Sequence, residues 1–163
     1  MAHRAIHLKT PLDAELLVSS IEGFEELSQL PRFELEVACA SPFAFDQLLG
    51  QKVRIDLEIG RHHSYRHGMV TELYLTDSDD YYTHYRLEIV PLVWRLTKRV
   101  HSRIFTKKTI PDILEAVFKD YRVKKLLRRK YHARDYVVQY QESDFHFACR
   151  LMEEEGIYYY FDN

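Results

Sequence analysis

The side chains best suited to chemistry in this chain are nine histidines, two cysteines and several acidic clusters. Three histidines lie close together between two glycines, in a stretch that predicts a hairpin loop: His62, His63 and His67. Zinc needs three or four ligands held in tetrahedral geometry, and adjacent histidines in a loop do not provide it. We therefore expect exposed histidines here and no metal site.

The acidic clusters match no catalytic or calcium pattern. Asp77, Asp79 and Glu88 occupy positions 1, 3 and 12 of a calcium loop. Tyr82 stands at position 6, where such a loop requires glycine. The adjacent glutamates 153–155 lie at a predicted helix end, where neighbouring side chains diverge by about 100° and cannot meet on one substrate atom. We expect all of these to be solvated or interface charges.

The remaining nucleophiles have no signature around them. Cys39 and Cys149 lie in apolar patterns, which predicts buried thiols. The sequence contains no GxSxG, no GxGxxG and no GxxxxGK[ST]. It therefore predicts no catalytic residue and no cofactor, and the chain is not expected to be an enzyme.

The elements that would position these residues are predicted to be mostly strands over the first 100 residues. Apolar and polar residues alternate in four segments, which predicts strands with one buried face: 33–39, 53–59, 69–76 and 85–89. Turns are predicted at 60–68 and 77–80, and a short helix at 42–49, capped by Ser41 and ended by Gly50. Leu16, Val18 and Ile21 fit a further strand. Strands spaced in this way suit a small antiparallel barrel or sandwich.

After residue 105 the apolar spacing becomes helical. Five residues share one helix face: Ile110, Ile113, Leu114, Val117 and Phe118. Thr109 and Asp112 resemble a capping box, and a second helix is predicted from Asp144 to Glu155, between the cap Ser143 and the stop Gly156. Segments 136–140 and 157–161 are predicted strands.

The fold class is therefore mainly β with a few helices, of the α+β type. Two domains are expected, at 1–105 and 106–163. Because a terminal strand usually needs a partner, we also expect the sequence to continue downstream of residue 163. No run of 18 apolar residues predicts a membrane helix, and the first residues lack the apolar core of a secretory signal.

The near-zero formal charge of −2 hides a strong polarity. Residues 95–134 contain fourteen Lys and Arg but three acidic residues, a local charge of +11 against −13 elsewhere. The basic side chains are densest at Arg122, Lys124, Lys125, Arg128, Arg129, Lys130 and Arg134. This pattern fits a nucleic-acid patch, a basic face that meets an acidic face on another subunit, or a solvated surface. A nucleic-acid patch would need interleaved aromatic residues, and Tyr131 alone gives little support.

The last quarter of the chain closely resembles the signature of the VgrG family, the spike proteins of type VI secretion systems. The matching residues include Gln139, Tyr140, Glu142, Ser143, Asp144, Phe145, Arg150, Leu151, Glu153, Glu154, Glu155 and Gly156. Upstream blocks at 91–96, 103–105 and 109–114 match the family in the same order. One departure is His67 before Gly68, where the family commonly has an aromatic residue.

The resemblance implies a mechanical role. Family members are similar to the hub of contractile phage tails, whose small β-barrels trimerise into a ring that docks on the hexameric tube protein, Hcp. It implies a homotrimer, with effector or adaptor proteins as further partners, in a bacterial protein assembled in the cytoplasm and exported. Residues 106–163 would be the truncated start of a second hub domain. A nucleic-acid-binding module using residues 95–134 stays as the alternative function, and residues 122–134 are expected to be mobile or at an edge.

Overall fold

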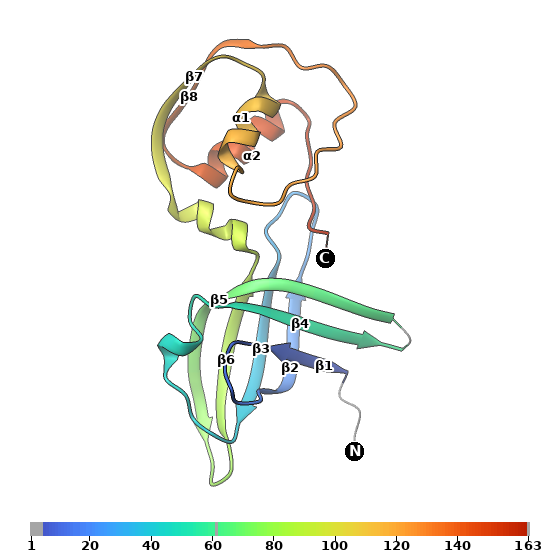
Figure 1. Cartoon of the computed structure of the whole chain (residues 1–163), viewed down its shortest axis with the longest axis vertical. Helices are drawn as coiled ribbons and strands as arrows, with labels where there is room; N and C mark the ends of the chain where they lie inside the picture. Colours follow the sequence, from blue (N-terminus) through green and yellow to red (C-terminus); the bar gives the residue numbers. More distant parts are fainter. Residues whose placement is uncertain (1–4, 61, 163) are drawn as a thin grey trace. The chain divides into compact units, whose positions relative to one another are not determined.

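The computed structural model describes residues 5–60 and 62–162. Their elements follow one another as shown in Figure 1. They are β1 (Ile6–Lys9), β2 (Leu17–Phe24), β3 (Arg32–Cys39), η1 (Phe45–Gln47), β4 (Lys52–Ile59), β5 (His62–Ser78), β6 (Thr83–Val90), η2 (Leu92–Lys98), β7 (Val100–Lys108), α1 (Ile110–Val117), β8 (Arg134–Ser143) and α2 (Asp144–Glu154). The predicted mainly β, α+β class is confirmed.

The chain divides into two compact units. The first comprises the residues up to Leu92 together with Phe161 and Asp162, and the second extends from Val93 to Tyr160. This boundary lies earlier than the expected one at 105/106 because β7 pairs with β8 and so belongs to the second unit.

The first unit is one curled antiparallel sheet in the order β1-β4-β5-β6-β3-β2. The two edge strands, β1 and β2, approach each other, so that the sheet bends toward an incomplete barrel (Figure 1). The expectation of a small antiparallel barrel is therefore confirmed. The long strand β5 pairs with β4 through its first half and with β6 through its second half, which lets it span the bend.

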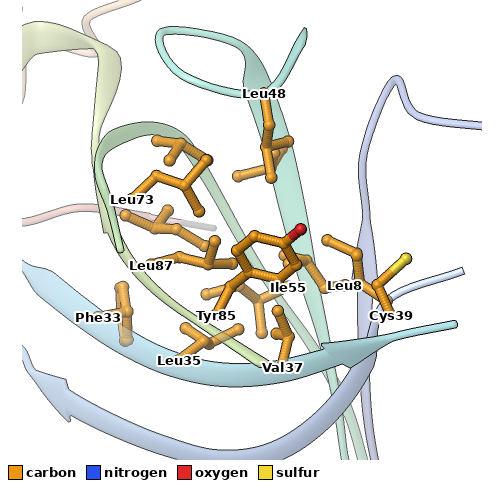
Figure 2. Packing of buried hydrophobic residues seen from close by; sticks show 14 residues of the cluster. Leu8, Phe33, Leu35, Val37, Cys39, Leu48, Ile55, Leu73, Tyr85 and Leu87 are labelled. Atoms are coloured by element: carbon orange, nitrogen blue, oxygen red, sulfur yellow. The ribbon is translucent and has the colours of Figure 1, made fainter. Parts of the chain in front are cut away.

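The barrel core comes from the predicted alternation. The inward residues of β3, Leu35 and Val37, pack with Ile55 of β4 and Leu87 of β6 (Figure 2). Tyr85 is 2% exposed and its ring lies 4.6 Å from that of Phe43. These buried apolar groups supply the main free energy that holds the sheet curled.

The second unit packs two helices on one face of the β7–β8 ribbon. Its core joins the apolar faces of α1 and α2 to one residue each of η2 and β8. The buried residues are Leu96, Ile110, Ile113, Leu114, Val117, Val137, Phe147, Ala148, Leu151 and Met152. The rings of Phe105 on β7 and Phe147 on α2 stack with centroids 5.7 Å apart.

The predicted helix ends are confirmed. Thr109 Oγ1 accepts a hydrogen bond from the Asp112 amide, and the Asp112 carboxylate accepts one from the Thr109 amide. Ser143 caps α2 by accepting from the amide of His146. Gly156, at φ +63°, allows two backbone bonds back into α2 that satisfy its last carbonyls.

Three local predictions are wrong. The helix expected at 42–49 is a single 3-10 turn, Phe45–Gln47, because the Gln47 side chain accepts from the Ala44 amide and fixes the start there. The segment 157–161 is not a strand, because its backbone is irregular after the turn at Gly156. The loop expected at 60–68 is mostly strand, because β5 already begins at His62. Within the described residues, no helix is both long and apolar enough to span a bilayer.

Candidate functional site

The signature residues converge on one buried carboxylate, that of Asp144, at the start of α2. Its side chain has no exposure. Arg103 Nη2 donates to Oδ1 at 2.5 Å, Gln139 Nε2 donates at 3.0 Å, and His101 Nδ1 lies 3.0 Å away. Arg99 Nε lies 3.4 Å from Oδ2. Strand β7 thus supplies Arg103 and His101 inward, and β8 supplies the side-chain amide of Gln139.

This arrangement keeps Asp144 ionised. Burial alone would raise the pKa of its carboxyl, but hydrogen bonds from Gln139 and His101 and the charge of Arg103 outweigh burial and hold that pKa below its ordinary value. Gln139 is itself fully buried, and its Oε1 accepts from Arg103 Nε at 2.8 Å. The cluster therefore ties β7, β8 and α2 together through one polar network, in which Asp144 Oδ1 accepts the hydrogen bonds and Oδ2, within the described residues, has only the ion pair with Arg99.

A second network joins the other end of the signature. Arg150 on α2 donates to Glu142 at 2.6 Å and lies 3.2 Å from Glu154. Arg134 bridges Glu154 and Glu155, each at 2.5 Å. Two of the three adjacent glutamates thus hold the end of α2 against the start of β8, and their role in this structure is contact within the chain.

The signature splits into inward and outward residues. Leu151 is fully buried and Phe145 is half-buried against Tyr159, whereas Tyr140 is 71% exposed. Tyr140 belongs to a surface that the sequence patterns do not reveal. The outer face of the β7–β8 ribbon, which we call the ribbon face, carries Val100, Ile104, Tyr136, Val138 and Tyr140.

The ribbon face is apolar although it is exposed to solvent. Ile104 is 70% exposed and stands directly opposite Val138, and Tyr136 is 70% exposed. Exposed apolar groups gathered on one sheet face are typical of a protein–protein contact. The alternation in the sequence does not predict this surface. In β7 the polar residues His101 and Arg103 face inward, whereas the apolar residue Ile104 faces outward, which is the reverse of the usual arrangement.

The basic segment 122–130 has neither helix nor strand, and all its side chains are exposed. Lys125 pairs with Glu115 at 2.7 Å, and Arg129 pairs with Glu155 at 2.6 Å while its guanidinium lies over the ring of Tyr131. Part of its charge is therefore neutralised within the chain. The structure brings none of the candidate interface residues Arg122, Lys124, Lys125, Arg128, Arg129 and Lys130 into the ribbon face.

The first unit carries an opposite charge pattern. Strand register places four glutamates in one row across β2, β3, β6 and β5: Glu22, Glu34, Glu88 and Glu72. Directly opposed like charges destabilise a sheet. Arg32 compensates Glu88 at 2.9 Å, and Arg86 lies 3.4 Å from Glu34. The register thus assembles a glutamate row on the outer sheet face, partly compensated by arginines, which spacing in the sequence alone does not reveal.

The histidines and cysteines do not assemble into a site. His62, His63 and His67 are exposed along β5 rather than in a loop. Over residues 5–60 and 62–162, no three His, Cys, Asp or Glu side chains are grouped so as to hold a metal ion. Cys39 is buried as predicted, whereas Cys149 is half-buried, with burial raising the pKa of its thiol.

A curled antiparallel barrel, an α+β unit with buried ion networks and an exposed apolar ribbon face define an assembly protein of the phage-tail type. The chain belongs to the phage tail baseplate hub (GPD) family, whose model matches residues 24–163. Over 164 residues it is 37% identical to the type VI secretion system spike protein VgrG1c of Pseudomonas aeruginosa, covering 97% of this chain and 23% of that protein. The resemblance to VgrG proteins is thus confirmed.

Other relatives agree. The actin cross-linking toxin VgrG1 of Vibrio cholerae is 32% identical over 163 residues, covering 91% of this chain and 15% of the toxin. The E. coli c3393 structure, a type VI secretion component similar to the T4 tail proteins gp27 and gp5, superposes with a TM-score of 0.87 at 26% identity, over 96% of this chain and 45% of that one. A prophage tail protein of Shewanella oneidensis shares the fold, with a TM-score of 0.62 at 16% identity. The chain spans about a quarter of the length of VgrG1c.

Proposed function

We propose that this chain is the hub part of a type VI secretion spike, a non-enzymatic subunit that forms a homotrimeric ring on the hexameric tube protein Hcp. The first unit would be one barrel of that ring, and the second unit the opening of the next hub domain. In the cell it would assemble in the cytoplasm and leave with the spike, which carries effector or adaptor proteins.

The ribbon face is the observation that carries this proposal. A subunit that worked alone would leave Ile104, Val138, Tyr136 and Tyr140 in water at a cost in hydrophobic free energy. In an assembly the same side chains would be covered. Tyrosine is enriched in protein–protein interfaces, which agrees with this role.

Charge supports the assembly role as well. The glutamate row of the first unit and the basic segment 122–130 of the second would attract each other between copies, and such complementarity steers and orients association. The nucleic-acid alternative gains no support, because Lys125 and Arg129 already pair with glutamates and the segment 122–130 contains no aromatic residue on which a base could stack.

The experiment is sedimentation equilibrium of the chain at rising concentration. The proposal predicts reversible self-association toward a trimer. A species that stays monomeric at millimolar concentration and also fails to bind the tube hexamer would contradict it. A titration with duplex DNA at low and moderate salt tests the alternative, which predicts binding that weakens with salt and is abolished in Arg128→Glu/Arg129→Glu.

A further inference from the structure

The connection between α1 and β8 is a long loop (orange in Figure 1) of sixteen residues, from Phe118 to Ala133, without helix or strand. Structureless connections of this length are uncommon in compact folds and usually serve a function. Its middle, the basic segment 122–130, consists of six Lys or Arg and three aliphatic residues. No acidic residue occurs between Asp120 and Asp135. The segment therefore combines uninterrupted positive charge with apolar side chains.

The three aliphatic side chains of this segment are exposed, Val123 by 55%, Leu126 by 62% and Leu127 by 37%. Exposed aliphatic groups cost hydrophobic free energy unless another surface covers them. Their spacing of i, i+3 and i+4 would place all three on one side of a helical turn, with the cations of residues 122–129 on the other side. Such a separation is typical of segments that bind at a lipid–water interface.

Ion pairs within the chain neutralise part of the charge of this segment. Lys125 pairs with Glu115, and Arg129 pairs with Glu155. Both pairs involve exposed basic side chains, and such pairs contribute little to stability, so they hold the segment only loosely. Over the described residues, the other four cations are exposed and belong to no ion pair: Arg122, Lys124, Arg128 and Lys130. The segment therefore keeps a positive charge for a partner.

The mixture of cations and aliphatic groups distinguishes between anionic partners. A nucleic acid would attract the cations, but the segment contains no aromatic residue on which a base could stack. The glutamate row of a second copy would also attract the cations, whereas its carboxylates would leave the aliphatic side chains without an apolar partner. A bilayer with anionic lipids supplies both parts, namely charged headgroups and an apolar acyl boundary.

We propose that the basic segment 122–130 binds the surface of an anionic lipid bilayer. The four cations outside ion pairs lie on the headgroups, and the three aliphatic side chains insert at the acyl boundary. The attraction of the cations weakens with salt, because ions screen it. The aliphatic side chains add a contribution that does not depend on charge. This membrane contact goes beyond the proposed assembly and does not depend on it.

The direct test is co-sedimentation of the whole chain with two kinds of vesicle, phosphatidylcholine alone and phosphatidylcholine mixed with phosphatidylglycerol. We expect binding to the mixed vesicles that is at least about tenfold stronger than binding to phosphatidylcholine and that weakens with salt. Equal binding to both kinds, or no binding to the mixed vesicles, would overturn the inference. Neither result bears on the proposed function, which is tested separately by binding to the tube hexamer.

Two variants separate the contribution of charge from that of the aliphatic groups. Lys124→Glu/Arg128→Glu reverses two charges and should lower the partition onto mixed vesicles at least about tenfold. Leu126→Ser/Leu127→Ser keeps the charge and should lower the same partition severalfold. Because these side chains are exposed, both variants should fold like wild type, which circular dichroism checks. Vesicle binding that neither variant weakens would place the contact elsewhere on the chain and overturn the inference.

The matched control is Lys52→Glu/Lys108→Glu, which reverses two exposed charges outside the segment and should weaken vesicle binding far less than Lys124→Glu/Arg128→Glu. Equal loss in these two variants would show that net charge alone is responsible and would contradict the assignment to this segment. Duplex DNA provides the last comparison. If DNA binds wild type and Leu126→Ser/Leu127→Ser equally while mixed vesicles bind neither, the segment is a nucleic-acid site and the lipid inference is wrong.

Discussion

Arg103 and Asp144 are 41 residues apart in the chain, yet Nη2 of the arginine lies 2.5 Å from Oδ1 of the aspartate. The pair joins the middle of β7 to the first residue of α2. Since the Asp144 side chain is fully buried, the stability of the second unit depends on this contact and on the groups that share it.

Removing the Asp144 carboxylate should therefore lower the free energy of unfolding of the second unit. Asp144→Ala removes the acceptor of Arg103 and of the fully buried Gln139 amide, and unsatisfied buried polar groups cost about 1–3 kcal/mol in free energy of unfolding. Urea unfolding followed by fluorescence of Trp94, the single tryptophan, reports on this unit.

The control is Asp120→Ala, which removes an exposed carboxylate 3.6 Å from Arg99. Exposed ion pairs contribute little, so its effect should stay within about 0.5 kcal/mol. Similar decreases in the free energy of unfolding of Asp144→Ala and Asp120→Ala would contradict a special role for Asp144.

The same carboxylate gives the second unit a defined acid sensitivity. The folded-state pKa of Asp144 is lower than its unfolded value, so its ionised form stabilises the fold at pH above about 4. That contribution is lost as pH falls below about 4 and through the folded pKa. The stability difference between wild type and Asp144→Asn should shrink over that range, whereas a constant difference from pH 7 to 3 would show that Asp144 does not titrate as described.

Gly68 is predicted to be required by close packing. A Cβ at this position would lie 2.6 Å from Ile89 Cγ2 and 2.7 Å from the carbonyl oxygen of Val90. The carbonyl belongs to a paired strand and cannot move freely, so Gly68→Ala should lower the free energy of unfolding by about 1–3 kcal/mol. Circular dichroism during urea unfolding measures this, and a change below about 0.5 kcal/mol would contradict the packing argument.

The ribbon face should matter for association and not for folding. Ile104→Asp places a charge at a side chain that is 70% exposed, so the stability of a single copy should change by less than about 0.5 kcal/mol. Self-association measured by sedimentation should weaken at least severalfold. Leu27→Asp, which makes the same change at a 59% exposed residue of the first unit, is the control. If both variants associate like wild type, the ribbon face is not the contact.

Much of the barrel follows from sequence because its strands obey a simple rule. In β3, Phe33, Leu35 and Val37 face the core while polar residues between them face water. The capped ends of α1 and α2 are equally local, since a cap and its partner lie three residues apart. Such features depend on neighbouring residues and can be predicted without the tertiary fold.

The buried ion network and the surface charge rows depend on contacts between residues that are distant in the sequence. Strand β7 presents His101 and Arg103 inward because Asp144 lies there, and no local pattern indicates a buried carboxylate so far along the chain. The basic row of Lys9, Arg54 and His67 likewise exists through strand register alone. Such surfaces could be predicted from sequence only if the pairing of the strands were already known.

The most direct test of the hub assignment is the mass of the complex that this chain forms with purified hexameric tube protein, measured by native mass spectrometry. Hub assembly predicts three copies of the chain on one tube hexamer, with the monomer and the trimer as the other species. A tube hexamer whose mass is unchanged by a large excess of the chain would contradict the account.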